Sequence, residues 1–77
     1  MHPIIAILSY RGEIFAFRHI EDARAEYDRL LRKNSMRGLE NIARREHTTV
    51  DEVIDIFIAD AESGFDSETF IQEVELR

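Results

Sequence analysis

The sequence predicts a small α+β domain in which a β-hairpin, three helices and a C-terminal strand follow one another, in the order ββαααβ. Three observations predict this class. Residues 3–20 form two short apolar runs separated by Arg11 and Gly12, which is the pattern of a β-hairpin. Residues 21–63 carry apolar residues at helical spacing, and residues 70–76 return to an alternating pattern. We expect the strands to form a small antiparallel sheet packed against the helices.

The length and composition are those of one small domain, residues 1–77. Apolar residues make up 44% of the chain, which is enough for a compact core despite 34% charged residues. The chain has no cysteine, so no disulfide supports the fold, and small domains without such supports often gain stability by forming oligomers. No run approaches the roughly 20 apolar residues that span a bilayer. We therefore expect a cytoplasmic protein with no membrane partner.

The predicted hairpin is apolar on both of its faces. A two-residue turn would place Leu8 opposite Phe15 and Ala6 opposite Phe17 on one face. The other face is rich in isoleucine and also holds Ala16, Ser9 and Arg18. Because one layer of helices covers only one face of a sheet, either the chain wraps the second face or another subunit contacts it. This second face is our candidate for self-association, through Ile5, Ile7 and Ile14.

The central region is predicted to hold three helices, each with one apolar face. The first covers residues 21–33, and the second begins with Ser35 as its N-cap. Thr49 and Glu52 form a capping box that begins the third helix, and Gly64 ends it. We expect the first and third helices to lie over the sheet, with the second bracing them. The predicted buried residues are Ala23, Tyr27, Leu30, Leu31, Met36, Leu39, Ile42, Ala43, Val50, Val53, Ile54, Phe57, Ile58 and Ala61.

The C-terminal segment can be interpreted in two ways. Phe70, Val74 and Leu76 occupy alternate positions, which favours a strand that joins the hairpin. Asp66 or Ser67 could instead cap a short helix. We favour the strand, because it would complete a three-stranded antiparallel sheet.

Charge is distributed unevenly along the chain, whose formal net charge is -6. Residues 24–45 contain seven bases against three acids, whereas residues 46–77 contain ten acids against Arg77 alone. The chain is therefore electrically polar along its length. This asymmetry is the main functional signal in the sequence.

Residues 39–58 resemble a helix-turn-helix unit, a motif that many proteins use to read DNA. The resemblance rests on four apolar residues at the spacing of such units: Ile42, Ala43, Val53 and Ile58. Two turn positions depart from the motif, since Glu46 stands where an apolar residue is usual and His47 where glycine is usual. The resemblance implies that the second helix would enter the major groove.

The charge of that second helix opposes DNA reading. A helix in the major groove lies near phosphates on both sides, so it needs Arg, Lys, Asn or Gln. Asp51, Glu52 and Asp55 would be repelled there. We therefore favour the simpler interpretation, in which the two helices form a hairpin that completes the core.

A basic stretch earlier in the chain is the better candidate for contact with nucleic acid. It spans the end of the first helix and the exposed face of the second, and it could contact backbone phosphates. The alternative is that these bases pair with nearby acids and with the acidic third helix. The candidate residues are Arg29, Arg32, Lys33, Arg37, Arg44 and Arg45.

The third predicted helix carries the surface on which we base the favoured function. Its carboxylates lie away from its apolar stripe, and Ile56 also points away from that stripe. Such a face would bind a protein with a basic surface, with the apolar side chain as anchor and the charges setting rate and specificity. The same acids could instead only solubilise the protein or imitate nucleic-acid phosphates. The predicted protein-binding residues are Asp51, Glu52, Asp55, Ile56 and Glu62.

We therefore predict a small acidic protein that is not an enzyme and that binds and modulates another macromolecule, foremost a protein. Compact accessory factors and inhibitors of phages and mobile elements are one such class. A nucleic-acid-binding regulator is the first alternative, and a purely structural homo-oligomer subunit, such as a homodimer, is the second. The serines lack a partner histidine, the histidines are not at metal-ligand spacing, and three glycines form no phosphate-binding loop. We predict no catalytic residue, metal ion or cofactor.

Overall fold

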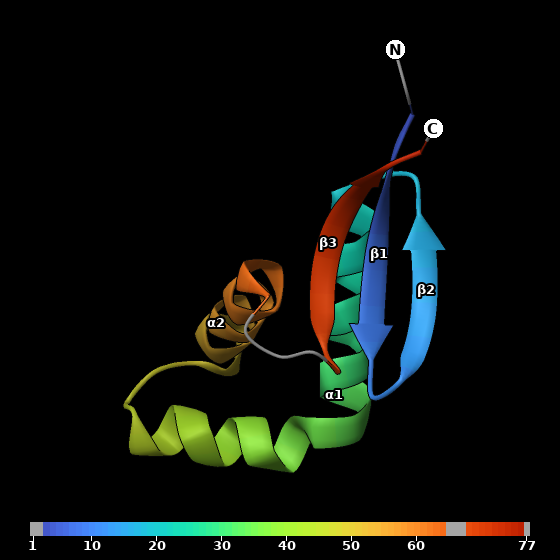
Figure 1. Ribbon diagram of the computed structural model, residues 1–77. Coiled ribbons are helices and arrows are strands. Elements are labelled where there is room, and N and C mark those ends of the chain that lie inside the picture. Colours follow the sequence, from blue (N-terminus) through green and yellow to red (C-terminus); the bar gives the residue numbers. More distant parts are fainter. Residues whose placement is uncertain (1–2, 65–67, 77) are drawn as a thin grey trace.

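The computed structural model describes residues 3–64 and 68–76, and the chain is α+β with the elements in the order β1, β2, α1, α2, β3 (Figure 1). The strands are Ile4–Tyr10, Glu13–Phe17 and Phe70–Glu75, and the helices are Ile20–Arg45 and Val50–Ser63. Residues 66 and 67, which the alternative C-terminal helix would use as caps, lie outside the described residues.

The prediction of three helices is wrong, because the first two form one kinked helix. α1 runs from Ile20 to Arg45, and Ser35 departs from helical geometry with φ −137° and ψ 18°. An N-cap residue has an extended backbone, as Thr49 has before α2 with ψ 159°. Ser35 therefore does not start a new helix; it bends a continuing one, as Figure 1 shows in the green part of α1. The order of elements is ββααβ.

β1 is the central strand of the sheet, whose order is β2-β1-β3. Arg11 with φ 50° and Gly12 with φ 88° form a two-residue turn in which both φ angles are positive, a conformation that matches the twist of a hairpin. The turn sets the predicted register, with Leu8 opposite Phe15. β3 pairs antiparallel with the other edge of β1, which confirms the predicted C-terminal strand and the three-stranded sheet.

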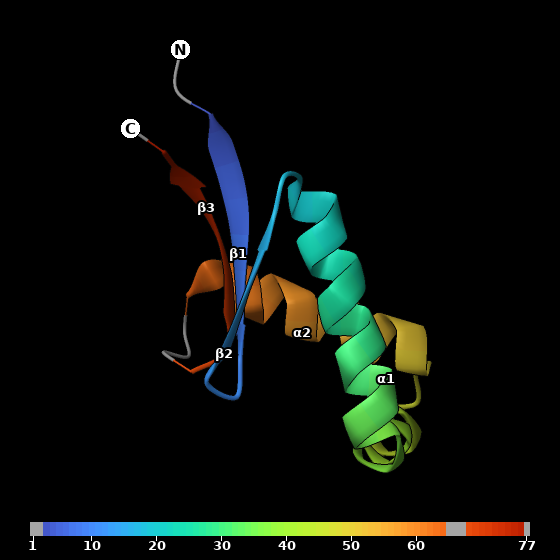
Figure 2. The same ribbon diagram turned by 90° about the vertical axis from the view of Figure 1, so that its right-hand side faces the viewer.

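The helices cover one face and one edge of the sheet. The first half of α1 crosses one face, and α2 lies beside β3 (Figures 1 and 2). Within the described residues α2 contacts α1 and β3 but neither β1 nor β2, which corrects the expectation that the last helix lies over the sheet. The kink is the reason, since it turns the second half of α1 away from the sheet before α2 returns to its edge. No described helix covers the opposite face.

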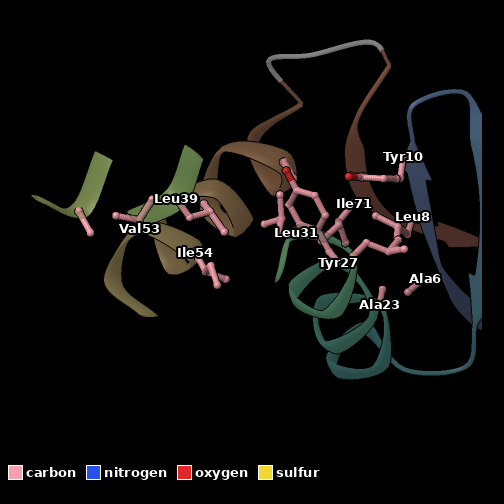
Figure 3. Packing of buried hydrophobic residues seen from close by; sticks show 13 residues of the cluster. Ala6, Leu8, Tyr10, Ala23, Tyr27, Leu31, Leu39, Val53, Ile54 and Ile71 are labelled. Carbon is pink, nitrogen blue, oxygen red and sulfur yellow. The ribbon is translucent and has the colours of Figure 1, made fainter. Parts of the chain in front are cut away.

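The buried residues form one cluster with two parts (Figure 3). Between the sheet and the first half of α1, Leu8 and Ile71 contribute from the strands, and Tyr10 meets Tyr27 edge-on with ring centroids 6.0 Å apart. The second part lies between the second half of α1 and α2. It contains Leu39, which is 1% exposed, together with Val53 and Ile54. The second part of the core fixes α2 and its outward face relative to the sheet.

Most of the predicted core is buried. The predicted core residues that are buried are Ala23, Tyr27, Leu30, Leu31, Leu39, Ala43, Val53, Ile54 and Ala61. Met36 and four residues that pack against the core are half-buried: Ile42, Val50, Phe57 and Ile58. The half-buried residues lie on the kinked arm formed by the second half of α1 and α2.

Candidate functional site

The start of α2 is fixed by side-chain caps, which sets the direction in which its outward residues point. The Thr49 hydroxyl oxygen accepts a hydrogen bond from the backbone N–H of Glu52 at 3.2 Å, as the predicted capping box requires. The Glu52 carboxylate accepts a hydrogen bond from the Thr48 hydroxyl instead of closing back on the Thr49 backbone. Gly64, with φ 77°, ends the helix in the left-handed conformation as predicted.

The outward face of α2 combines carboxylates with one large apolar side chain. Glu52, Ile56 and Asp60 stand four residues apart, so they form one row along the helix, and all are exposed. The Ile56 side chain is 59% exposed. Asp55 is exposed beside this row, and α2 contains no Lys or Arg. We call Glu52, Asp55, Ile56 and Asp60 the α2 outer face.

Two of the predicted protein-binding residues, Asp51 and Glu62, instead form ion pairs with α1 at the protein surface. Asp51 accepts a hydrogen bond from Arg32 Nη2 at 2.5 Å, and Glu62 is paired with Arg24. Both arginines come from the first half of α1, so the two pairs tie α2 to that half. The structure thus splits the predicted set, leaving Glu52, Asp55 and Ile56 on the outer face. Sequence reasoning left out Asp60, although its spacing from Ile56 marked it.

The basic residues also divide into those that form ion pairs within the protein and those that do not. Arg29 donates two hydrogen bonds to the Glu26 carboxylate, at 2.8 and 2.6 Å, and Arg32 donates to Asp28 at 2.6 Å. These contacts follow helical spacing and neutralise the bases locally. The Arg29 hydrogen bond lowers the pKa of the Glu26 carboxyl from its ordinary value. Hydrogen bonds to Asp51 and then Asp28 raise the pKa of Arg32.

Near the kink and beyond it, α1 carries bases that have no such partners. Lys33, Arg37 and Arg44 are exposed and form no ion pair within the described residues. Arg45 lies 3.9 Å from Glu46, and its side chain is 73% exposed. Of the six predicted phosphate-contacting residues, the structure therefore leaves Lys33, Arg37 and Arg44 fully available.

The turn between α1 and α2, in the segment that resembles a helix-turn-helix unit in sequence, has no glycine. His47 adopts φ 54°, the left-handed conformation that glycine usually supplies. The Thr48 N–H donates to the Ala43 carbonyl at 2.9 Å and the His47 N–H to the Arg44 carbonyl at 3.3 Å, which completes a Schellman motif. α1 therefore ends in an ordinary C-terminal helix motif, with His47 in the place that glycine usually takes.

The predicted self-association residues lie together on the sheet face that α1 does not cover. Ile5 and Ile7 are half-buried, and Ile14 is 63% exposed. β3 adds Phe70 and Val74 to the same face, opposite Ser9 and Ile5. The sequence showed their alternation, but only the pairing of β3 with β1 places them beside the isoleucines.

Among residues 3–64 and 68–76, no group of three or more metal-ligating side chains is positioned to hold a metal ion. Neither described helix has the length and apolar character needed to cross a bilayer. None of the protein-family models, curated proteins or solved structures compared with the chain matches it.

Proposed function

We propose that this protein binds, without catalysis, a basic surface on another protein through the α2 outer face and thereby modulates that partner. The observation that supports the proposal most strongly is the position of Ile56. This large apolar side chain is 59% exposed, and carboxylates lie on both sides of it along the helix. The core does not need it, so an apolar contact outside the chain would explain its presence.

The side chains of the α2 outer face indicate what kind of surface a partner would need. Apolar anchors in the centre of an interface carry much of its binding energy, whereas surrounding charges steer approach and reject wrong partners. Asp55 and Asp60 form no ion pair within the described residues. A partner with Lys or Arg around an apolar pocket would complement both parts of this face.

The contacts behind the face support its rigidity. Asp51 with Arg32 and Glu62 with Arg24 join the sides of α2 to α1. Exposed pairs of this kind add little stability, and the orientation of the helix rests on its buried residues, among them Ile54, which is 0% exposed. A surface that is already ordered loses less conformational entropy when it binds.

Affinity capture in cells that naturally make the protein tests the proposal. The wild-type chain should capture a basic protein after nuclease treatment, and Ile56→Lys should reduce that capture by at least about tenfold, as expected when an interface anchor is lost. Asp55→Asn with Asp60→Asn should also reduce it. The matched control is Glu13→Gln with Glu75→Gln, which removes two exposed carboxylates from the sheet. Equal capture by all variants would refute the α2 outer face.

A second candidate function is supported by the bases on the second half of α1. Arg37 and Arg44 are seven residues apart on an exposed helical face and have no ion-pair partner among the described residues. They could contact phosphates of a nucleic acid. In that case, binding to a duplex would weaken steeply with salt, and Arg37→Gln with Arg44→Gln would reduce the salt slope by about 2. Binding that ignores these two substitutions would exclude the second candidate.

A further inference from the structure

The uncovered face of the sheet has the composition of an interior. Its members are the strand residues whose side chains alternate away from α1: Ile5, Ile7, Ser9, Ile14, Ala16, Phe70, Gln72 and Val74. We call this set the open sheet face. None of these strand residues is charged, although 34% of the chain is charged. The exposed Arg18, one residue past β2, continues the same alternation at the end of the face.

The charged residues of the strands lie on the sheet face that α1 covers, whereas a sheet with one solvent-exposed face normally carries them on the exposed side. Antiparallel sheets with one solvated face normally place polar residues outward and apolar residues toward the core. Here Glu73 and Glu75 stand opposite Ala6 and Ile4, on the same face as the α1 contacts. The strand carboxylates thus lie on the face that α1 contacts, and the apolar side chains lie on the open sheet face.

Polar groups on the open sheet face are few and at least partly satisfied. The Ser9 hydroxyl donates a hydrogen bond to the Glu68 carbonyl at 2.9 Å, and Ser9 is 4% exposed. Ile14, by contrast, is 63% exposed. Leu76, one residue past β3 and in the same alternation, is 43% exposed. Large apolar side chains therefore reach solvent across the face from β2 to the end of β3.

The molecule also has more surface than a compact chain of its mass. Its accessible surface is 5646 Å², about 800 Å² above the value that the scaling law gives for a monomer of 9.0 kDa. Its radius of gyration is 13.4 Å, against about 11.5 Å for a compact domain of this length. Both values follow from an elongated shape of 46 × 21 × 20 Å. Such a shape leaves enough surface for an interface of standard size, in which each partner buries roughly 800 Å².

We infer that a second copy of this chain covers the open sheet face, so that two sheets stack in a symmetric dimer. Charge argues for a second copy. Two chains of net charge -6 repel each other, and the open sheet face is the place where two copies can meet without bringing carboxylates together. A face whose strand residues carry no charge is also complementary to itself, which a two-fold symmetric interface requires.

The inference does not depend on the function of α2. α2 lies at the β3 edge and makes no contact with β1 or β2 within the described residues, so stacking on the open sheet face leaves the α2 outer face free. Loss of the dimer and loss of partner capture can therefore be measured separately.

Sedimentation equilibrium over a wide concentration series tests the dimer. The wild-type chain should reach twice the mass of one chain, and Ile14→Glu should weaken the association by at least about 100-fold, because symmetry places the new charge in the interface twice. Ile56→Glu is the matched control, since Ile56 is 59% exposed where Ile14 is 63% exposed. A wild-type chain that stays monomeric throughout, or a dimer insensitive to Ile14→Glu, would overturn the inference.

A cysteine introduced into the open sheet face would measure directly whether the face is covered. It would be the only thiol in the protein, because the chain contains no cysteine. Ala16→Cys places a small, exposed thiol on the open sheet face, and its alkylation should slow as protein concentration rises. Ile56→Cys on α2 should react at the same rate at every concentration. Slowing at residue 56 with none at residue 16 would show that the copies meet through α2 and would contradict the inference.

Discussion

Two residues with left-handed backbone conformations end the two helices, and only one of them is a glycine. Gly64 has φ 77° and His47 has φ 54°. A side chain with a Cβ atom is strained in this region by about 1–2 kcal/mol, whereas glycine is not. His47 is exposed, so the fold bears this strain without a buried contact in return. The strain identifies the inter-helix turn as a position where stability can be gained.

Exchanging these residue types should change stability in opposite directions. His47→Gly should raise the free energy of unfolding by about 0.5–1 kcal/mol, since relief of strain exceeds the added flexibility of the unfolded chain. Gly64→Ala should lower it by about 1 kcal/mol, although no atom would contact the new Cβ. Urea denaturation of both variants measures the two differences. Loss of stability in His47→Gly would mean that the histidine side chain contributes a contact.

The titration of the Glu26 carboxyl should show whether its ion pair with Arg29 persists in solution. The hydrogen bond from Arg29 lowers the pKa of Glu26 in the folded protein, so the pair stabilises the fold above the ordinary pKa of a glutamate. That contribution should disappear as the pH falls through the lowered pKa. In Arg29→Gln, carboxyl NMR should show the Glu26 pKa returning toward its ordinary value. An unchanged titration would indicate that the pair does not persist in solution.

At the level of elements, the kink in α1 determines where α2 lies. Residues 34 and 35 favour neither helix nor strand strongly, so the local sequence is compatible with a break or with a bend. Packing decides between them. Tyr27 packs against Tyr10 of the sheet and Leu39 against α2, and both contacts are satisfied only if the axis turns at Ser35. Contacts between distant segments are invisible to local pattern, which is why the sequence predicted three helices.

Leu39 tests whether the arm beyond the kink is packed. It is 1% exposed and lies with Val53 and Ile54 in the second part of the core. Leu39→Ala should lower the free energy of unfolding by about 2–5 kcal/mol. Ile56→Ala, on the outer side of the same arm, should change it by less than about 0.5 kcal/mol. Equal effects of the two substitutions in denaturant titrations would show that α2 does not pack as described.

At the scale of the whole molecule, some bases of the basic region form ion pairs with acids of the acidic region. The sequence showed a basic and an acidic region but not which side chains meet, because Arg32 and Asp51 are 19 residues apart. The fold pairs some charges across α1 and α2 and leaves the α2 outer face negative. The apolar alternation of the hairpin likewise predicted Ile5, Ile7 and Ile14, whereas Val74 joins them only through the β1–β3 register.

The proposal that α2 binds a basic protein is tested most directly by mapping the contact surface. Amide resonances of the isotope-labelled chain should be followed while the captured partner is added. The largest shifts should cluster around Asp55 and Ile56, and the resonances of the face from Arg37 to Arg44 should stay unchanged. Shifts confined to that basic face or to the strands, with α2 undisturbed, would contradict it.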